Sequence, residues 1–364
     1  MPDTFDASSD IEVIKQRKKE GIDIPLHKNV QAKTTSTYLE YVRLVHNALP
    51  ELDYDDIDTS MTFLGKRFSA PLIIDSMTGG TDEATIINGR LSELAEKYGF
   101  GMGLGSQRAG LKSEELAATY SIARKNAPNA FLIANIGGAQ LSKGLTVDEA
   151  KRIVKMIRAN ALVVHLNPLQ ELVQPEGEPR YKGVLAQISE LAKTIDVPLI
   201  VKEVGAGISK EVAIKLEMAN VSAINIAGTG GTSWAGVEKL RAESLKDDLK
   251  KHLGEIFWDW GIPTAASLIE VRHAVKLPLI ASGGLRNGLE VAKCIALGAS
   301  MAAMAYPFLQ TAAQSRENLF AFADRILAEL KSTMFLVGAK NTAALASSRY
   351  ILTGMLAHEV SSRT

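Results

Sequence analysis

The stretch "AFLIANIG" at residues 130–137, followed by "ALVVHLN" at 161–167 and "PLIVKEVG" at 198–205, decides the fold of this chain. Each run is short, apolar and rich in Val, Ile and Leu, which is typical of a strand buried on both faces. Stretches with helical periodicity separate the runs, at residues 147–159 and 183–194. Strand and helix in unbroken alternation predict parallel strands covered by helices.

Five similar runs extend this pattern on both sides, at residues 71–77, 101–106, 222–228, 278–284 and 301–307. Further helices are expected at 82–98, 113–126 and 209–220. Eight strand–helix repeats are the number that a (β/α)8 TIM barrel needs, so we predict this α/β fold. We expect one domain, with an N-terminal extension over 1–69, the barrel over 70–308 and C-terminal helices over 309–364. A doubly wound open sheet is the alternative, although no early GxGxxG motif supports it.

The composition excludes several classes of protein. The 364 residues include 41 Lys and Arg against 41 Asp and Glu, so the formal net charge is zero and we expect no nucleic-acid partner. With 46% hydrophobic residues the chain is not expected to be disordered. The single Cys294 allows no internal disulfide and fits a reducing compartment. Because the first 20 residues lack an apolar run and no stretch has bilayer length, we expect a cytoplasmic protein without membrane contact.

Polar residues gather where the predicted strands end, and in a parallel barrel this end carries the active site. The densest group is "VVHLNPLQE" at 163–171, in which His165 and Asn167 project to the same side of the strand. Gln170 and Glu171 follow directly, so we expect all four to converge on one pocket. Lys202 ends a strand of Leu, Ile and Val and needs an anionic or electron-rich partner, because an unpaired buried ammonium is costly.

Two glycine-rich turns follow late strands, "AGTGGT" at 227–232 and "ASGGLR" at 281–286. In barrels of this kind, phosphate groups commonly bind at the loops of the last strands, where backbone amides are free and glycine allows close approach. Arg286 would add a planar guanidinium to the same phosphate. These turns predict a cofactor or substrate that carries phosphate.

Taken in order, the motifs resemble those of the type 2 isopentenyl diphosphate isomerases, a family that uses flavin mononucleotide (FMN). The similarity spans nearly the whole chain and includes "APLIIDSMTGG" from residue 70, "MGLGSQR" from 102, "VHLNPLQE" from 164, "VKEVG" from 201, "GTGGTSW" from 228 and "SGGLRNG" from 282. Other FMN barrels, such as the 2-hydroxy-acid oxidases and IMP dehydrogenase, share the late glycine turns. They are not expected to share "HLNPLQE" or "SQR".

The resemblance implies an isomerase that converts isopentenyl diphosphate into dimethylallyl diphosphate, with reduced FMN as acid/base cofactor, Mg2+ as metal and NADPH as the reductant of FMN. It also implies a homotetramer or homo-octamer. The residues expected to bind FMN are Ser76, Met77, Thr78, Ser106, Asn135, Lys202, Ala227, Thr232, Gly283, Gly284, Leu285, Arg286, Met304 and Ala305. Those that match the family's substrate ligands are Arg17, Lys18, Ser106, Gln107, Arg108, His165, Asn167 and Gln170.

Three residues carry further predicted roles, which for Glu171 and Lys202 come from the same resemblance. Glu171 matches the Mg2+ ligand, and one carboxylate with phosphate oxygens and water is an ordinary arrangement for this ion. Gln170 and Lys202 are the predicted catalytic residues. Gln170 would position or relay a proton, and Lys202 would lie near the flavin ring and favour its anionic reduced form.

The chain departs from the family pattern at three positions. Gly21 stands where relatives carry His after Arg-Lys, so a diphosphate contact is either missing or supplied by His27. Val204 and Ile226 stand where relatives often carry hydroxyl residues near the flavin. We expect an altered FMN affinity rather than a loss of activity.

Two other functions stay open from the residues alone. An FMN oxidoreductase acting on a 2-hydroxy acid or a nucleotide would use His165 as its base and an Arg or Tyr for the substrate carboxylate. A non-enzymatic barrel that binds a phosphate ligand would leave the crowded strand ends unexplained.

Overall fold

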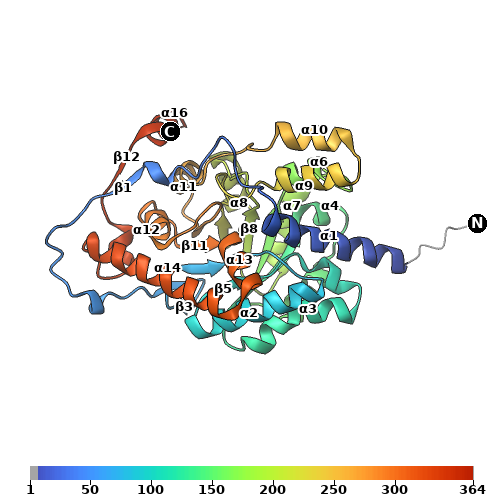
Figure 1. The fold of residues 1–364 in the computed structure, drawn as a ribbon, viewed down its shortest axis with the longest axis horizontal. Helices are drawn as coiled ribbons and strands as arrows, with labels where there is room; N and C mark the ends of the chain where they lie inside the picture. Colours follow the sequence, from blue (N-terminus) through green and yellow to red (C-terminus); the bar gives the residue numbers. More distant parts are fainter. Residues whose placement is uncertain (1–6, 364) are drawn as a thin grey trace, which may run out of the picture.

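A computed structural model describes residues 7–363 and confirms a closed barrel of eight parallel strands (Figure 1). Each predicted run holds one strand: β4 (Leu72–Ile74), β5 (Gly101–Gly103), β6 (Phe131–Gly137), β7 (Ala161–Leu166), β8 (Leu199–Glu203), β9 (Ala223–Asn225), β10 (Leu279–Ala281) and β11 (Met301–Met304). Neighbours in the barrel follow chain order. The ring closes where β11 pairs with β4, with Ala302 opposite Leu72.

A ring of helices covers the barrel: α2 (Asp82–Tyr98), α3 (Glu114–Asn126), α5 (Val147–Met156), α7 (Val184–Thr194), α8 (Lys210–Met218), α11 (Thr264–Ala274), α12 (Gly288–Ala296) and α14 (Arg316–Leu336). Local signals set their ends, since the Thr146 hydroxyl caps α5 and Glu149 bonds back to the amide of Thr146. Helix α14 comes from the C-terminal region and packs against α2 and α12, so this region completes the ring.

Aromatic side chains close the N-terminal end of the barrel. The hairpin of β2 (Met61–Phe63) and β3 (Lys66–Phe68) brings Phe63 and Phe68 against Phe131 at the start of β6. The rings of Phe68 and Phe131 lie 5.3 Å apart, and those of Phe63 and Phe68 lie 6.3 Å apart. With apolar side chains filling the interior above them, only the C-terminal end of the barrel is left for binding.

The N-terminal extension and the C-terminal tail are joined, because β1 (Val42–Leu44) pairs antiparallel with β12 (Tyr350–Leu352). Helix α1 (Ala7–His27) lies at the C-terminal end of the barrel, against α9 (Trp234–Ser244) and α13 (Tyr306–Gln314). The other helices are α4 (Gly138–Ser142), α6 (Pro168–Val173), α10 (Asp248–Ile256), α15 (Thr342–Ala346) and α16 (Gly354–Arg363), with short 3-10 helices η1 (Leu39–Tyr41), η2 (Tyr54–Asp56) and η3 (Gln107–Leu111).

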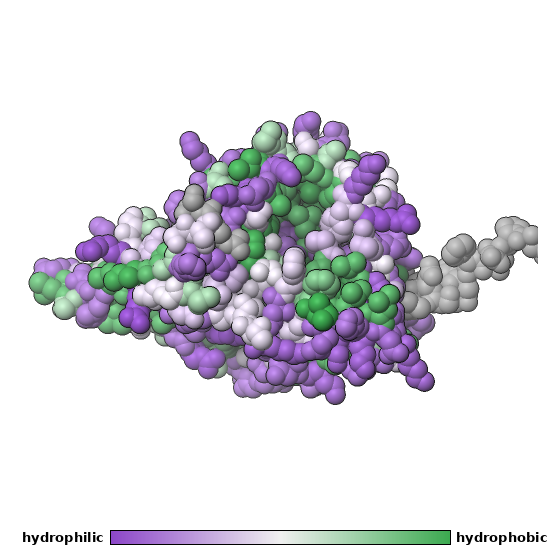
Figure 2. Space-filling model, turned by 90° about the horizontal axis from the view of Figure 1, so that it is seen from above, coloured by the Kyte–Doolittle hydropathy of each residue, from purple (hydrophilic) through white to green (hydrophobic). Residues whose placement is uncertain are grey.

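Hydrophilic residues dominate the outer surface seen in Figure 2, and hydrophobic residues gather there in a few patches. Within residues 7–363, no helix combines the length and the apolar character that crossing a bilayer requires.

Candidate active site

A cavity of ≈ 440 Å³ opens at the C-terminal ends of the strands. Its wall includes α1, the β4–α2 loop, α6 and α9, together with the start of α13. The cavity brings together most of the residues singled out in the sequence: Arg17, Lys18, Ser76, Met77, Thr78, Ser106, Arg108, Asn135, His165, Asn167, Gln170, Glu171, Lys202, Thr232 and Ala305. Gly21 also lines it, and a Cβ placed there would have open space around it.

The remaining candidates lie outside this lining: Gln107, Ala227, Gly283, Gly284, Leu285, Arg286 and Met304. Gln107 is fully buried, and its side chain accepts from the amide of Asn135 at 3.1 Å and donates to the carbonyl of Ile153 at 3.3 Å. The Gln107 side chain therefore bonds to the backbone of β6 and α5 and does not line the cavity. His27 is the last residue of α1 and is exposed outside the lining.

Lys202 forms a buried ion pair deep in the cavity. Its Nζ lies 2.9 Å from Oδ2 of Asp75, with the two side chains 8% and 7% exposed, and it also donates to the carbonyl of Glu203 at 3.0 Å. Asp75 is held in turn by the amide of Ser76 at 2.8 Å. The anionic partner that Lys202 needs on its apolar strand is therefore the Asp75 carboxylate of the same chain.

His165 is held in one orientation by its neighbour on β6. Nδ1 of His165 lies 2.7 Å from Oδ1 of Asn135, and Asn135 Nδ2 donates to the carbonyl of Leu104 at 3.0 Å. Burial lowers the pKa of His165 to about 3, and the positive charges of Lys202 and Lys18 act in the same direction. The imidazole is therefore neutral near pH 7, with Nδ1–H donating to the amide oxygen.

Three cations face the mouth of the cavity, Arg17 and Lys18 from α1 and Arg108 from η3. Within the described residues none of them has a carboxylate in ion-pair contact. Lys18 Nζ donates to the carbonyl of Ser106 at 2.9 Å. Burial, together with the charges of Arg17 and Arg108, lowers the pKa of Lys18 to about 7. Three basic groups gathered at this density, with no acid bonded to them in the described residues, mark a site for a multiply charged anion.

The α6 wall of the cavity holds a chain of amide and carboxylate contacts. Asn167 Nδ2 donates to Gln170 Oε1 at 3.1 Å, and Gln170 Nε2 donates to Glu238 Oε1 at 2.9 Å. Glu238 is bonded to Arg241, whose guanidinium also contacts Glu20 and Glu176. Because Glu238 accepts a hydrogen bond from the side-chain nitrogen of Gln170, the side-chain oxygen of Gln170 points toward Asn167.

Glu171 lies in the same wall with amide partners only. Its Oε1 is 3.4 Å from Asn167 Nδ2, and its Oε2 accepts from the amide of Glu178 at 3.0 Å. No cluster of three or more His, Cys, Asp or Glu residues with metal-binding geometry exists in the described part of the chain. A cation at Glu171 would therefore need most of its oxygen ligands from a bound molecule or water.

The two glycine-rich turns touch each other. A Cβ on Gly231 would come within 2.6 Å of Gly284, whose φ of +77° is strained for other residues. Beside them, Arg286 Nη2 donates to Gln31 Oε1 at 2.6 Å, and the described residues place no acid in ion-pair contact with its guanidinium. The turns thus adjoin a second positive group, separate from the cluster at the cavity mouth.

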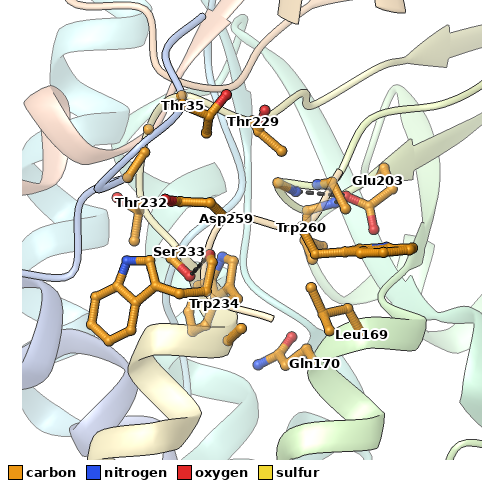
Figure 3. Close-up of a pocket in the computed structure, with 18 residues that line it drawn as sticks. Thr35, Leu169, Gln170, Glu203, Thr229, Thr232, Ser233, Trp234, Asp259 and Trp260 are labelled. Atoms are coloured by element: carbon orange, nitrogen blue, oxygen red, sulfur yellow. Dashed lines mark hydrogen bonds between the residues drawn. The ribbon is translucent and has the colours of Figure 1, made fainter. Parts of the chain in front are cut away.

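A side pocket of ≈ 30 Å³ lies beside the start of α9 (Figure 3). Asp259 accepts from the amides of Lys33 and Thr34 at 3.0 and 2.7 Å, and Trp258 Nε1 donates to the carbonyl of Gln31 at 3.0 Å. Glu203 caps the turn after β8 by accepting from three successive amides. The contacts of Asp259 and Trp258 fasten the segment that leads from α1 to the barrel, and Glu203 fixes its own turn.

The comparisons with known proteins agree with this geometry. A protein from a Nostoc species named isopentenyl-diphosphate delta-isomerase is 48% identical over 92% of this chain and 95% of its own length. A protein of the same name from Methanosarcina mazei is 46% identical over 94% of this chain and 93% of its own length. The chain belongs to the isopentenyl-diphosphate delta-isomerase family.

Two further likenesses concern the barrel. The family model for FMN-dependent dehydrogenases matches residues 179–352. A mandelate oxidase structure superposes with a TM-score of 0.64 over 94% of this chain and 100% of its own, at 18% identity. At that identity the superposition shows the shared fold alone.

The residues of this family member fit a flavin with its phosphate. The hydroxyl oxygens of Thr78 and Ser106 are buried at the cavity and lack a hydrogen-bond partner, as does that of Thr229 in the glycine-rich turn; these are the only such side-chain oxygens in the described residues. Since buried hydroxyls are nearly always bonded, these three indicate a bound polar molecule. Its phosphate would lie near the glycine turns and Arg286.

The structure adds residues that the sequence motifs did not single out, namely Asp75, Glu238 and Arg241. Asp75 stands at the end of "PLIID", so its place at a strand end was a usable signal. Glu238 and Arg241 lie on α9 within "WAGVEKLRAES", whose charged residues are those of an ordinary exposed helix. Their burial comes from distant segments that pack over them.

Proposed function

We propose that this chain interconverts isopentenyl diphosphate and dimethylallyl diphosphate. The observation that carries the proposal is the cluster of Arg17, Lys18 and Arg108, three basic groups at the mouth of a cavity lined by family-matched residues, none of them in an ion pair with an acid of the described residues. Diphosphate is a multiply charged anion, and guanidinium groups bind its oxygens in a planar, paired geometry. The names of the relatives point to the same substrate class.

FMN is the cofactor in this proposal. Its ring would lie against the residues of the β4–α2 loop, with Thr78 and Ser106 as hydroxyl partners and Lys202 nearby. When bound in the reduced form, FMN supplies an acidic and a basic position close together, which suits protonation of an alkene and loss of an allylic proton. The ion pair with Asp75 fixes the Lys202 ammonium, so its positive charge is in place before any ligand arrives.

The side chains of β7 and the α6 wall orient the short hydrocarbon part of the substrate. Gln170 and Asn167 are held by each other and by Glu238, which fixes the direction of both amides. His165 is neutral and anchored by Asn135, so it offers an uncharged ring to the cavity. Together these groups hold the reacting carbons in one orientation, which is the main contribution a protein makes to such a step.

Mg2+ and NADPH complete the proposal. Glu171 would give Mg2+ one carboxylate, and the diphosphate and water would give the other oxygens, which fits the preference of this ion for phosphate and retained hydration. NADPH would reduce the FMN before turnover. We further propose a cytoplasmic homotetramer or homo-octamer, for which sedimentation velocity is the direct measurement.

Anaerobic turnover tests the proposal. Protein, FMN, Mg2+ and isopentenyl diphosphate are mixed under nitrogen with dithionite, and dimethylallyl diphosphate is followed by NMR. We expect product without net consumption of reductant. Stoichiometric oxidation of a 2-hydroxy acid with no isomerisation would instead favour an oxidoreductase, and isopentenyl diphosphate left unchanged with fully bleached, protein-bound FMN would refute the isomerase.

A further inference from the structure

Arg241 joins three segments of the chain at one buried point. Its side chain is 4% exposed, and its guanidinium contacts Glu20 from α1, Glu176 from the loop after α6, and Glu238 one turn earlier on α9. The Nε–Glu20 and Nη1–Glu238 distances are both 2.7 Å. A planar guanidinium with five donors can serve three acceptors at once, which an ammonium on a flexible stem does less well.

Two of these contacts lead to different parts of the cavity. Glu20 lies on α1 one turn beyond Arg17 and two residues after Lys18, so its contact fixes the helix that carries those two basic residues. Glu238 receives the amide of Gln170, so its contact fixes the direction of Gln170. Arg241 itself borders the cavity wall and serves both ends of the site.

The other contacts of α1 do not replace this one. Lys15 reaches Glu115 of α3 at 2.9 Å through a pair whose acid is 74% exposed, and such pairs contribute little. Lys18 donates to the carbonyl of Ser106, a bond that must rearrange if Lys18 turns to an anion. Among the described ionic contacts between α1 and the helices around the barrel, Glu20 with Arg241 is more buried than Lys15 with Glu115.

We propose that Arg241 is a positioning residue that couples the docking of α1 over the cavity to the orientation of Gln170. The proposal rests on the proposed function, because it assigns α1 to the diphosphate and Gln170 to the reacting carbons. When α1 is seated, Glu20 shares the guanidinium, and Arg241 holds Glu238 where it accepts from Gln170. When Arg241 is absent, both ends of the site lose their support together.

Single substitutions distinguish the effect of Arg241 on α1 from its effect on Gln170. Glu20→Gln loosens α1 alone, so we expect the KM for isopentenyl diphosphate to rise about tenfold with kcat within about twofold of wild type. Arg241→Gln loosens both ends, so we expect the same rise in KM together with a fall in kcat of about 100-fold, the scale of a misplaced reacting group. Arg241→Lys keeps the charge and should recover part of kcat.

A second readout does not depend on isomerisation. Hydrogen exchange of the α1 amides is measured on FMN-loaded protein with and without inorganic diphosphate. We expect faster exchange in Glu20→Gln and Arg241→Gln than in wild type, and slowing by diphosphate in wild type. Glu243→Gln, on the same helix but in an exposed pair with Lys239, is the matched control and should change neither readout.

The outcomes decide between the alternatives. Wild-type KM, kcat and α1 exchange in Arg241→Gln and in Arg241→Lys would overturn the proposal. Lower thermal stability in Arg241→Gln with unchanged kcat and KM per bound flavin would also overturn it, since that is a structural role alone. If the wild-type protein does not isomerise, the proposed function fails, and the α1 exchange data still show whether Arg241 fixes the helix.

Discussion

Removal of the Lys202 side chain should destabilise the protein because it leaves a carboxylate buried without its counter-charge. Lys202 Nζ and Asp75 Oδ2 lie 2.9 Å apart, with both side chains under one tenth exposed. At an effective dielectric constant of about 20, unit charges at that distance attract by about 6 kcal/mol, and losing one partner of a buried pair typically costs about 3–5 kcal/mol. The Ser76 amide stays bonded to Asp75, so we expect the lower value for Lys202→Met, about 3 kcal/mol.

A double-mutant cycle measures this directly. The free energy of unfolding in urea is determined for wild type, Lys202→Met, Asp75→Asn and the double variant. Because the double variant contains no buried charge at this point, it should be more stable than the sum of the single losses predicts, by about 2–3 kcal/mol. Lys239→Met, which breaks an exposed pair with Glu243, is the control and should cost under about 1 kcal/mol. Additive losses, or a Lys202→Met cost as small as the control, would refute the reasoning.

Three further outcomes are expected. Burial lowers the pKa of Lys18 to about 7, so binding of inorganic diphosphate at pH 8 should take up about one proton and should weaken as the pH rises above 7. Calorimetry in buffers of different ionisation enthalpy measures this uptake. Equal proton uptake in Lys18→Met would contradict the prediction. His165, whose pKa burial lowers to about 3, binds fewer protons folded than unfolded between about pH 3 and 6.5, so it adds stability as pH rises through that window, and its ring should show no NMR titration near pH 6.5. Glu171→Gln should raise the Mg2+ concentration for half-maximal activity about tenfold; an unchanged Mg2+ dependence would remove Glu171 as the metal ligand.

The barrel was predictable because its signals are local. The predicted helix over 82–98 coincides with α2, since the Thr81 side chain accepts from the amide of Ala84 at its start and Gly99, with φ at +63°, ends it. The positions of the strands can likewise be predicted from short stretches of sequence, because an unbroken apolar run has no polar face for solvent and must be buried on both sides. The order of the strands then follows from the handedness of strand–helix–strand connections.

The partners of the polar residues were less predictable, because they depend on segments far apart in the chain. The need of Lys202 for a partner could be inferred from its apolar strand, but the choice of Asp75, 127 positions earlier, required the closed ring of strands. Gln107 stands in the "SQR" motif beside two cavity residues, yet its side chain turns behind β6. A motif shows which residues are neighbours in the sequence. It does not show which way each side chain points from the turn.

The arrangement of charges in the cavity was also not predictable from the sequence alone, and this arrangement bears on the identity of the ligand. The whole chain has 41 positive and 41 negative residues, and the cavity gathers charges of both signs from distant segments. Arg17, Lys18 and Arg108 come from α1 and η3, and Glu171 comes from α6, where its carboxylate accepts from amides and is close enough to Arg108 to interact with its charge. An anion alone would satisfy the three basic groups and bring negative charge toward the Glu171 carboxylate. A diphosphate that brings a divalent cation satisfies both, so substrate and metal should each raise the affinity for the other.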